Sequence, residues 1–324
     1  MGSYMDLISE IEDKFTRGQM ITFEEAIELS KGKVEDEKLF LLADKLCKEN
    51  MGYKVELCSI INAKSGSCSE NCKFCAQSGH YNTGVVSYPL IDIDHVQKAA
   101  KENEKEGVHR FSIVTSGERV SDEEFEKILD MILLLRKETG LKLCASLGSL
   151  SYERAIRLKQ AGVSMYHHNI EACREYYKKI CDTHTYAHRI STVKNAAKAG
   201  LEVCCGGIIG MGESMEQRVK MAFEIRGLGV KSVPINILNP IKGTPLENVE
   251  SLQPNQILRT IAIFRLIMPH ASIRYAGGRM SLGEHQPKGF KAGINAMMVG
   301  NYLTTVGNKI SDDIQMIQSM GLKI

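Results

Sequence analysis

The chain has no excess of charge of either sign, no long apolar run and no low-complexity segment, and each absence excludes a class of protein. Its 324 residues carry 41 Lys and Arg against 39 Asp and Glu, which leaves no basic footprint for nucleic acid or an anionic membrane. No apolar run reaches the roughly 18 residues that a membrane span needs. Residues 6–17 are acidic and lack the apolar region of a secretory signal. We therefore expect a cytoplasmic protein that acts on small molecules, with no nucleic-acid and no membrane partner.

Short apolar runs alternate with amphipathic helical patterns from residue 55 onward, which is typical of a parallel sheet with crossover helices. Eight strands are predicted, at residues 55–62, 110–114, 141–147, 164–170, 202–208, 232–238, 272–275 and 296–299. Helices are predicted at residues 122–138, 151–160, 186–199, 215–228 and 254–268. Eight such units close naturally into a barrel. We expect an α/β fold, a (β/α)8 TIM-type barrel over residues 51–324 that forms a single functional domain, preceded by an N-terminal helical cap over residues 1–50.

Ten cysteines are unusual in a chain that is expected to be cytoplasmic, because that compartment keeps thiols reduced. Cys68, Cys72 and Cys75 form a Cys-x-x-x-Cys-x-x-Cys cluster just after the first predicted strand. That position is the carboxyl-terminal mouth of the barrel, where barrel enzymes have their active sites. Three thiolates at this spacing can bind three irons of a 4Fe-4S cluster and leave the fourth iron open to a ligand. A structural zinc site that adds His80 is the alternative that the sequence allows.

The cysteine loop resembles that of the radical S-adenosylmethionine superfamily, since Phe74 precedes the third cysteine and a predicted strand precedes the loop. The resemblance implies that S-adenosylmethionine binds the open iron and is cleaved by one electron to a 5′-deoxyadenosyl radical. The cofactor then carries the difficult step, so no catalytic acid or base is expected. The resemblance also places Phe74 near the adenine, although simple core packing is the other interpretation. It places Ser116, Gly117 and Glu118 at the methionine part of the cofactor.

Further stretches resemble one family of that superfamily, the biotin synthases, from about residue 55 to residue 308. They lie at residues 64–78, 166–171, 203–213, 232–236, 242–245, 274–279 and 303–305. The resemblance implies a sulfurtransferase that inserts sulfur between C6 and C9 of dethiobiotin, with S-adenosylmethionine as the oxidant. It also implies an electron donor such as flavodoxin or ferredoxin, and a homodimer.

The same resemblance assigns binding residues for both small molecules. Asn169 and Glu171 are expected at the ribose hydroxyls of the cofactor, although the family usually has Asp where Glu171 stands. The glycine-rich backbone of residues 206–213, with Ile208, is expected against the adenine.

For the substrate, Asn236 is expected at the ureido group of dethiobiotin, and Thr304 and Thr305 are expected at its carboxylate. The other interpretation of Asn236 is an ordinary buried amide that bonds to the backbone.

A second, auxiliary iron–sulfur cluster is expected deep in the barrel. Familiar members of the family hold a 2Fe-2S cluster there with three cysteines and one arginine, and it supplies the inserted sulfur. Cys144, Cys204 and Arg274 match that ligand set, but Ser112 stands where the remaining cysteine belongs. Serine is a poor ligand for iron–sulfur chemistry.

Cys58, on the first predicted strand, is the expected replacement for the missing ligand, and a buried core cysteine is the alternative for it. Cys205 is a weaker candidate, because adjacent residues of a strand face opposite sides and Cys204 is already assigned to the interior. The resulting auxiliary cluster is either a 2Fe-2S cluster or a larger 4Fe type.

Two other functions remain open from the sequence. Another radical enzyme of the biotin-synthase-like group, such as a hydrogenase cofactor maturase or a methylornithine-type mutase, is favoured by Ser112 and the Ser116-Gly117-Glu118 stretch. An iron–sulfur carrier that only stores or delivers a cluster would explain the cysteines but not the set of contacts at the barrel mouth. Cleavage of S-adenosylmethionine under reducing, anaerobic conditions separates the carrier from the enzymes.

Overall fold

Parallel strands form a closed barrel in the computed structural model, which describes residues 3–305 and 307–324. The strands are β1 (Glu56–Lys64), β2 (Arg110–Thr115), β3 (Lys142–Ser146), β4 (Met165–His167), β5 (Glu202–Cys204), β6 (Gly207–Ile209), β7 (Ser232–Ile237), β8 (Ser272–Tyr275) and β9 (Ala296–Met298). Their order is β5-β4-β3-β2-β1-β9-β8-β7-β6, and pairing of Cys204 with Ser232 joins β5 to β7 and closes the ring. Because β5 and β6 are two halves of one interrupted strand, the circumference is that of an eight-stranded barrel. The predicted (β/α)8 fold is confirmed.

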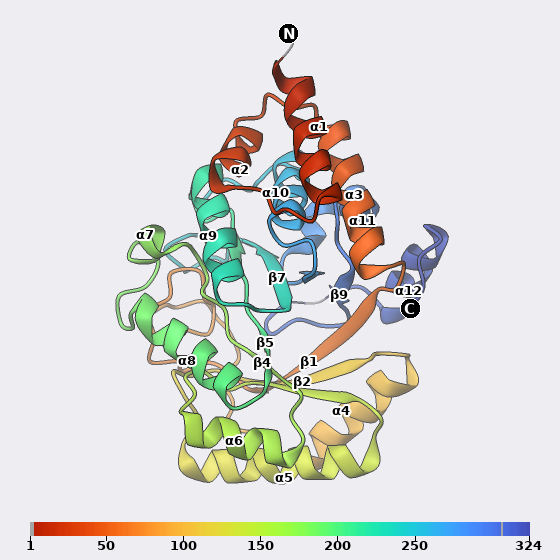
Figure 1. Ribbon diagram of the computed structural model, residues 1–324. Helices are drawn as coiled ribbons and strands as arrows, with labels where there is room; N and C mark the ends of the chain where they lie inside the picture. The colour runs from red at the N-terminus through yellow and green to blue at the C-terminus, as the bar shows by residue number, and fades with distance from the viewer. Residues whose placement is uncertain (1–2, 306) are drawn as a thin grey trace.

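Helices cover the outside of the barrel, mostly between successive strands (Figure 1). They are α1 (Ser3–Thr16), α2 (Phe23–Ser30), α3 (Asp36–Met51), α4 (Ile93–Lys105), α5 (Asp122–Glu138), α6 (Tyr152–Ala161), α7 (Arg174–Tyr177), α8 (Tyr186–Lys198), α9 (Met215–Gly227), α10 (Pro254–Ile267), α11 (Gln286–Lys291) and α12 (Ile310–Ser319), with a 3-10 helix η1 (Arg279–His285). Several begin at a capping residue, as α5 does at Ser121, whose hydroxyl accepts the Glu124 N–H while the Glu124 carboxylate accepts the Ser121 N–H. None of the helices described for residues 3–305 and 307–324 is both long and apolar enough to cross a membrane.

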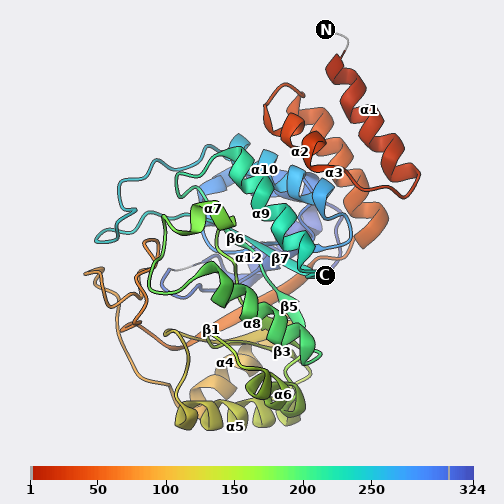
Figure 2. The ribbon, with the colours of Figure 1, turned by 60° about the vertical axis from the view of Figure 1, so that its left-hand side comes forward.

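Helices α2 and α3 pack against α9 and α10 at one side of the barrel, and α1 packs on α3 (Figure 2). The attachment uses Arg259 of α10, whose guanidinium donates to the carbonyls of Val34 at 3.0 Å and Leu29 at 2.6 Å. Those two residues flank the turn between α2 and α3. The predicted boundary between a cap and a barrel at residues 50 and 51 stays a prediction.

The structure differs from the expected elements at two kinds of place. The predicted strand at residues 202–208 breaks after Cys204, because Gly206 passes so close to β7 that a Cβ there would lie 1.9 Å from the Pro234 carbonyl oxygen. Only glycine fits such an approach. Helices α4, α7, α11 and α12 were not predicted, and β4 is shorter than expected.

Candidate active site

Both expected sets of cysteines line one cavity of about 420 Å³ inside the barrel. Cys68, Cys72 and Cys75 come from the loop after β1, at the carboxyl ends of the strands. The second set lies nearer the amino ends and consists of Cys58 on β1, Cys144 on β3 and Cys204 on β5. The fold therefore brings residues from several strands to one space, as the sequence analysis expected.

The cysteine loop is held in place by its own backbone. The N–H of Cys68 donates to the Gln77 carbonyl at 3.0 Å, and the N–H of Gly79 donates back to the Cys68 carbonyl at 2.8 Å. Cys68 and Cys75 are half-buried, while Cys72 is buried. Burial raises the pKa of the Cys75 thiol to about 11. A thiolate at this position therefore needs a metal cation to stabilise it.

The arrangement of the loop fits a 4Fe-4S cluster better than a zinc ion. Zinc bonds of about 2.0–2.3 Å bring tetrahedral ligand atoms within roughly 4 Å of one another. Across residues 3–305 and 307–324, only Cys72, Cys181 and His184 bring three ligand atoms within 4.8 Å. His80 instead contacts the Ser69 carbonyl through Nε2 at 2.8 Å. The zinc alternative with His80 is therefore not assembled, whereas a cubane takes one thiolate at each of three separate irons.

Sequence reasoning missed two neighbours of the loop, Cys181 and His184. The Cys181 Sγ lies 3.7 Å from the Cys72 Sγ and 3.0 Å from the His184 Nδ1. The hydrogen bond from Cys72, with that from His184, lowers the pKa of the Cys181 thiol. His184 also contacts Glu70 of the cysteine loop at 2.6 Å. No sequence signal pointed here, because Cys72 and Cys181 are 109 positions apart.

The residues expected at the ribose form a connected buried group. Asn169 accepts the Gly206 N–H at 3.0 Å and donates to Glu171 at 3.3 Å. Arg189 lies 3.4 Å from the other carboxylate oxygen of Glu171. Burial raises the pKa of Glu171 against the opposing effect of Arg189. Glu171 has a φ of 65°, a left-handed conformation that is uncommon outside glycine.

The other residues expected around S-adenosylmethionine also line the cavity: Phe74, Ser116, Gly117, Glu118 and Ile208. The Ser116 hydroxyl is already used, since it donates to the Gly66 carbonyl at 2.8 Å. The Glu118 side chain is 38% exposed, and its carboxylate lies 3.8 Å from Arg119.

Asn236 is bonded to the backbone at both ends of its amide. It donates to the Gly207 carbonyl at 3.2 Å and accepts the Gly277 N–H at 3.0 Å, as the alternative interpretation described, and it still lines the cavity. Thr304 and Thr305 are exposed and lie at the rim of the same cavity.

The auxiliary set lies on the alternate strands β1, β3 and β5, and Arg274 of β8 lines the same cavity. Ser112 pairs in register with Cys144, and the Ser232 hydroxyl donates to the Cys204 Sγ at 3.3 Å. Burial raises the pKa of the Cys144 thiol to about 12. Arg274 is 2% exposed and donates through Nη2 to Glu56 at 2.8 Å, while its Nη1 is buried and has no hydrogen-bond partner among the residues that the structure describes. Since buried donors almost always have a partner, the free Nη1 suits an inorganic sulfide or iron ligand at the thiols.

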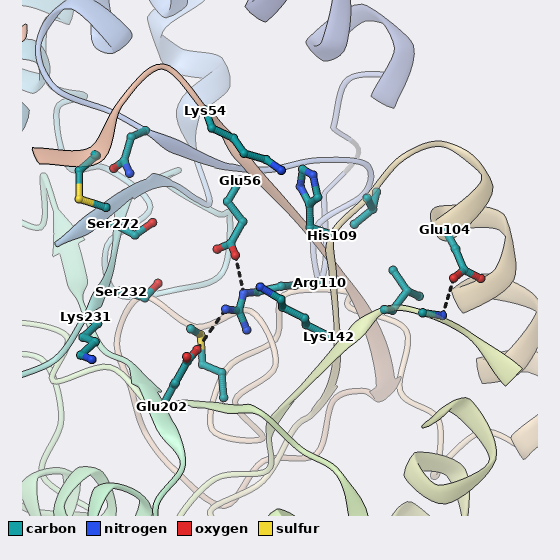
Figure 3. A pocket seen from close by; sticks show the side chains of 16 residues that line it. Lys54, Glu56, Glu104, His109, Arg110, Lys142, Glu202, Lys231, Ser232 and Ser272 are labelled. Carbon is teal, nitrogen blue, oxygen red and sulfur yellow. Dashed lines mark hydrogen bonds and ion pairs between the residues drawn. The ribbon is translucent and has the colours of Figure 1, made fainter. Parts of the chain in front are cut away.

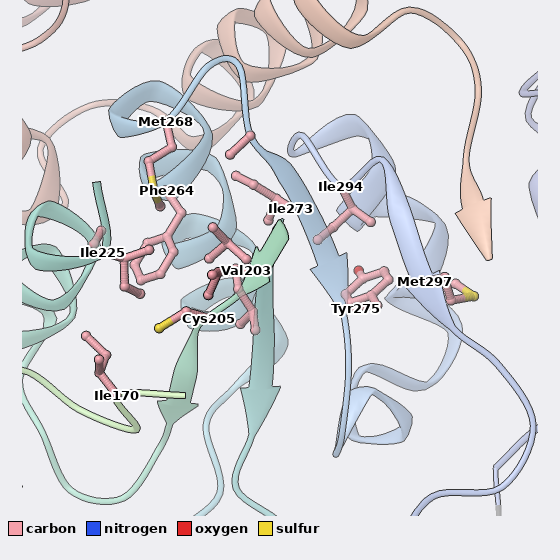
Figure 4. Packing of buried hydrophobic residues seen from close by; sticks show 14 of the residues in the cluster. Ile170, Val203, Cys205, Ile225, Phe264, Met268, Ile273, Tyr275, Ile294 and Met297 are labelled. Carbon is pink, nitrogen blue, oxygen red and sulfur yellow. The ribbon is translucent and has the colours of Figure 1, made fainter. Parts of the chain in front are cut away.

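Cys205 faces away from this set. It packs with Val203 among apolar residues of the layer between the barrel and its helices, where Phe264 and Ile225 are also found (Figure 4). The expectation that Cys204 faces inward and Cys205 outward agrees with this placement.

Comparisons with known proteins find matches along nearly the whole chain. Residues 64–225 match the Radical SAM superfamily, and residues 234–323 match the Biotin and Thiamin Synthesis associated domain. A biotin synthase of Acetivibrio thermocellus is 81% identical over 320 residues, which cover 99% of this chain and all of the relative. A biotin synthase of Clostridioides difficile is 54% identical over 321 residues, which cover 98% of this chain and 99% of the relative.

Solved structures of similar fold include a methylornithine synthase and the FeFe-hydrogenase maturase of Carboxydothermus hydrogenoformans. The first has a TM-score of 0.84 at 19% identity and covers 97% of this chain and 96% of its own. The second has a TM-score of 0.82 at 18% identity and covers 98% of this chain and 79% of its own. At such low identity these likenesses show the barrel fold alone.

Proposed function

The chain belongs to the biotin synthase family of the radical S-adenosylmethionine superfamily, and from this premise we propose which of its side chains carry the reaction. The activity is that of a sulfurtransferase, which inserts sulfur between C6 and C9 of dethiobiotin to form biotin. The observation that best supports the assignment of residues is the single cavity that both cysteine sets line. The high identity to biotin synthases leaves the maturase and mutase alternatives without support.

Cys68, Cys72 and Cys75 would hold the 4Fe-4S cluster that the family uses with S-adenosylmethionine. When bound, these two groups supply a carbon radical that removes hydrogen from C–H bonds that acid–base chemistry cannot reach. The protein's part is to orient the reactants and keep water out. Cys181 and His184 help to position the cysteine loop, because Cys181 contacts Cys72 from the segment after α7 and His184 contacts Cys181.

Asn169 and Glu171 would bind the ribose hydroxyls of S-adenosylmethionine. Their mutual hydrogen bond and the contact of Glu171 with Arg189 hold both acceptors in position before the cofactor arrives. Phe74 and Ile208 would flank the adenine, and the stretch from Ser116 to Glu118 would face the methionine part.

Cys58, Cys144 and Cys204 would hold the auxiliary cluster that donates the sulfur, with Arg274 as a ligand or hydrogen-bond donor through its free Nη1. Three thiolates suit either a 2Fe-2S cluster with Arg274 as fourth ligand or a 4Fe cluster with an open iron. Ser112 lies beside this set, and its buried hydroxyl has no hydrogen-bond partner in the described part of the chain.

Asn236, Thr304 and Thr305 would bind dethiobiotin. Each end of the Asn236 amide makes one backbone hydrogen bond, so one N–H and one lone pair remain for the ureido group. The exposed hydroxyls of Thr304 and Thr305 suit the substrate's carboxylate at the rim. Further parts of the proposal are a cytoplasmic location, a flavodoxin or ferredoxin as electron donor, and a homodimer, all as the family resemblance implies.

An anaerobic reaction tests the function directly. Reconstituted protein, reductant, S-adenosylmethionine and dethiobiotin are combined, and the products are identified by mass spectrometry. Biotin together with 5′-deoxyadenosine is the expected result. 5′-Deoxyadenosine without biotin would show radical chemistry on a different substrate and overturn the substrate assignment.

A further inference from the structure

A second pocket of about 630 Å³ lies at the opposite end of the barrel from the cysteine loop. Its walls come from the starts of the strands, where Glu56, Lys142, Ser232 and Ser272 lie. Figure 3 shows these side chains around the open space, with Arg110 in their midst. We call it the lower pocket, and it lies outside the proposed sites for S-adenosylmethionine and dethiobiotin.

The lower pocket and the active-site cavity share a thin wall. Arg110 and Met165 line both spaces. Ser232 lines the lower pocket, and its hydroxyl reaches through to the Cys204 Sγ at 3.3 Å. The auxiliary thiols are therefore about one side chain away from the lower pocket, whereas the cysteine loop lies at the far end of the cavity.

Arg110 is held in this wall by acidic groups on either side. Its Nε donates to Glu56 at 2.7 Å and its Nη2 to Glu202 at 3.0 Å (Figure 3). Glu56 in turn accepts a hydrogen bond from Arg274, and the exposed fractions of the four side chains are 50% at Glu202, 8% at Arg110, 27% at Glu56 and 2% at Arg274. The line of charged groups thus runs from solvent at the lower pocket to the auxiliary thiols.

The chemistry along the line suits a small anion. Lys54, Arg110, Lys142 and Lys231 line the lower pocket, together with the carboxylates of Glu56, Glu104 and Glu202. Four cations against three carboxylates leave an excess of one positive charge, which favours the entry of an anion. Beyond the wall, the Ser112 hydroxyl and the Arg274 Nη1 are buried donors that find no partner within residues 3–305 and 307–324, and both residues line the active-site cavity. Unpartnered buried donors indicate a missing acceptor.

We propose that the lower pocket is the entrance through which inorganic hydrosulfide reaches the auxiliary thiols, past Arg110 and Met165. This inference rests on the proposed function, because sulfur insertion consumes one sulfur atom in each turnover. S-adenosylmethionine and dethiobiotin occupy the other mouth, so a separate path admits sulfur while both are bound. Delivery is a ligand exchange: the entering HS⁻ forms the bond to iron, a resident sulfide leaves its bond to iron, and the proton of the entering HS⁻ passes through water to the leaving sulfide, which departs as HS⁻. No oxidation state changes, so the exchange needs neither an oxidant nor a reductant.

Isotope exchange tests the route in the holoenzyme. The protein with both clusters is incubated anaerobically with ³⁴S-labelled sodium sulfide, without reductant, and the label in its acid-labile sulfide is followed by mass spectrometry. The same measurement on the Cys58→Ala variant gives the amount of label that enters the cysteine-loop cluster alone, and this amount is subtracted. Label is expected to enter the auxiliary site with S-adenosylmethionine and dethiobiotin bound. If the two bound ligands stop the exchange, hydrosulfide enters by their mouth and the proposal is wrong.

Ser272→Phe is designed to block the lower pocket, since Ser272 lines it and the Ser272 hydroxyl has no hydrogen-bond partner among the described residues. The exchange rate is expected to fall about tenfold or more, equivalent to a barrier increase of about 1.4 kcal/mol, while Ser272→Ala keeps the wild-type rate. Equal exchange in Ser272→Phe and wild type, at equal iron and sulfide content, would overturn the proposal.

A charge-reversed double variant, Lys142→Glu with Lys231→Glu, tests the route without filling the pocket. The rate of sulfide exchange in this variant is expected to fall and to depend more strongly on salt concentration, because the new carboxylates repel the entering anion and salt screens that repulsion. Unchanged exchange in this variant also counts against the route. Failure of the wild type to make any biotin would instead refute the proposed function, so the two failures are distinguishable.

Discussion

Cys204 and Cys205 are adjacent in the chain but lie on opposite sides of the barrel wall. Cys204 lines the active-site cavity and accepts a hydrogen bond from Ser232, whereas Cys205 packs in the apolar layer beneath the helices. The alternation of a β-strand explains the difference. Of the two thiols, only Cys204 can contribute to a cluster inside the barrel, and the remaining ligand has to come from another strand.

Cys58→Ala is therefore expected to remove the auxiliary cluster and leave the cysteine-loop cluster intact. Iron and sulfide content should fall to that of one cluster, biotin formation should cease, and cleavage of S-adenosylmethionine should persist. Chemical analysis measures the iron and the acid-labile sulfide, Mössbauer spectroscopy identifies the remaining cluster, and mass spectrometry measures biotin and 5′-deoxyadenosine. Cys205→Ala is the matched control and should keep both clusters, since it removes a buried thiol from the other face of the barrel wall. Undiminished auxiliary iron and sulfide in Cys58→Ala would rule out Cys58 as a ligand.

Glu171→Gln tests the ribose contact. The substitution keeps the size of the side chain but replaces a charged acceptor by a neutral amide, which weakens the hydrogen bonds that Glu171 offers. We expect the KM for S-adenosylmethionine to rise by about tenfold, corresponding to about 1.4 kcal/mol, with a smaller effect on kcat. The control is Glu175→Gln, an exposed carboxylate on α7 that pairs with Lys220 and lies outside the cavity. A KM equal to that of the control would place the ribose elsewhere.

Much of the fold follows from local patterns in the sequence. The apolar runs and the helical periodicity predicted how many strands surround the barrel, because each of these patterns reflects the burial of one strand or one helix. The break at Gly206 was not predictable, since it depends on the carbonyl of Pro234 from a strand that comes later in the chain.

The candidate site was predictable only where a motif or a resemblance marked it. The spacing of Cys68, Cys72 and Cys75 in the sequence predicts a cluster site, whereas Cys181 reaches Cys72 only through the tertiary fold. The lower pocket has no signature in sequence either, because its residues come from the starts of several strands and from the helices and loops before them. Contacts between residues that are far apart in the sequence leave no local pattern from which they could be predicted.

Glu124 links the acid stability of the protein to the end of β1. Its carboxylate pairs with Lys64 at 2.7 Å and caps α5. Burial acts to raise the pKa of Glu124, but the hydrogen bonds from Lys64 and Ser121 outweigh it, so that the pKa lies below its usual value of 4.5. A carboxyl with a lower pKa in the folded state adds stability that is complete above the unfolded pKa and is lost as the pH falls below it.

Glu124→Gln should therefore be less stable than wild type at pH 7, by about 0.5–1 kcal/mol in the free energy of unfolding, as is typical of a partly exposed pair. The difference should shrink as the pH falls below about 4.5, where wild-type Glu124 becomes protonated too. Urea unfolding under anaerobic conditions at several pH values measures both effects. Glu123→Gln, on the exposed side of the same helix, controls for the general loss of charge. A gap that is independent of pH would contradict the assignment.

Asp313 and Arg279 form an ion pair in which both side chains have no exposed surface, with 2.5 Å between Arg279 Nη2 and the carboxylate. Arg279 also donates to the Tyr302 hydroxyl at 2.8 Å, so the pair fixes the segment that leads to Thr304 and Thr305. Asp313→Ala leaves the guanidinium buried without its counter-ion, at a cost of about 3–5 kcal/mol in stability.

The looser segment should also raise the KM for dethiobiotin without changing the KM for S-adenosylmethionine, because only the former is proposed to contact Thr304 and Thr305. Thermal unfolding and steady-state kinetics measure the two effects. Asp312→Ala is the matched control, since Asp312 is the exposed neighbour on the same helix and should leave both quantities unchanged. If Asp313→Ala loses stability but keeps the dethiobiotin KM, the ion pair supports the fold alone, and the carboxylate of the substrate must be bound by residues outside this segment.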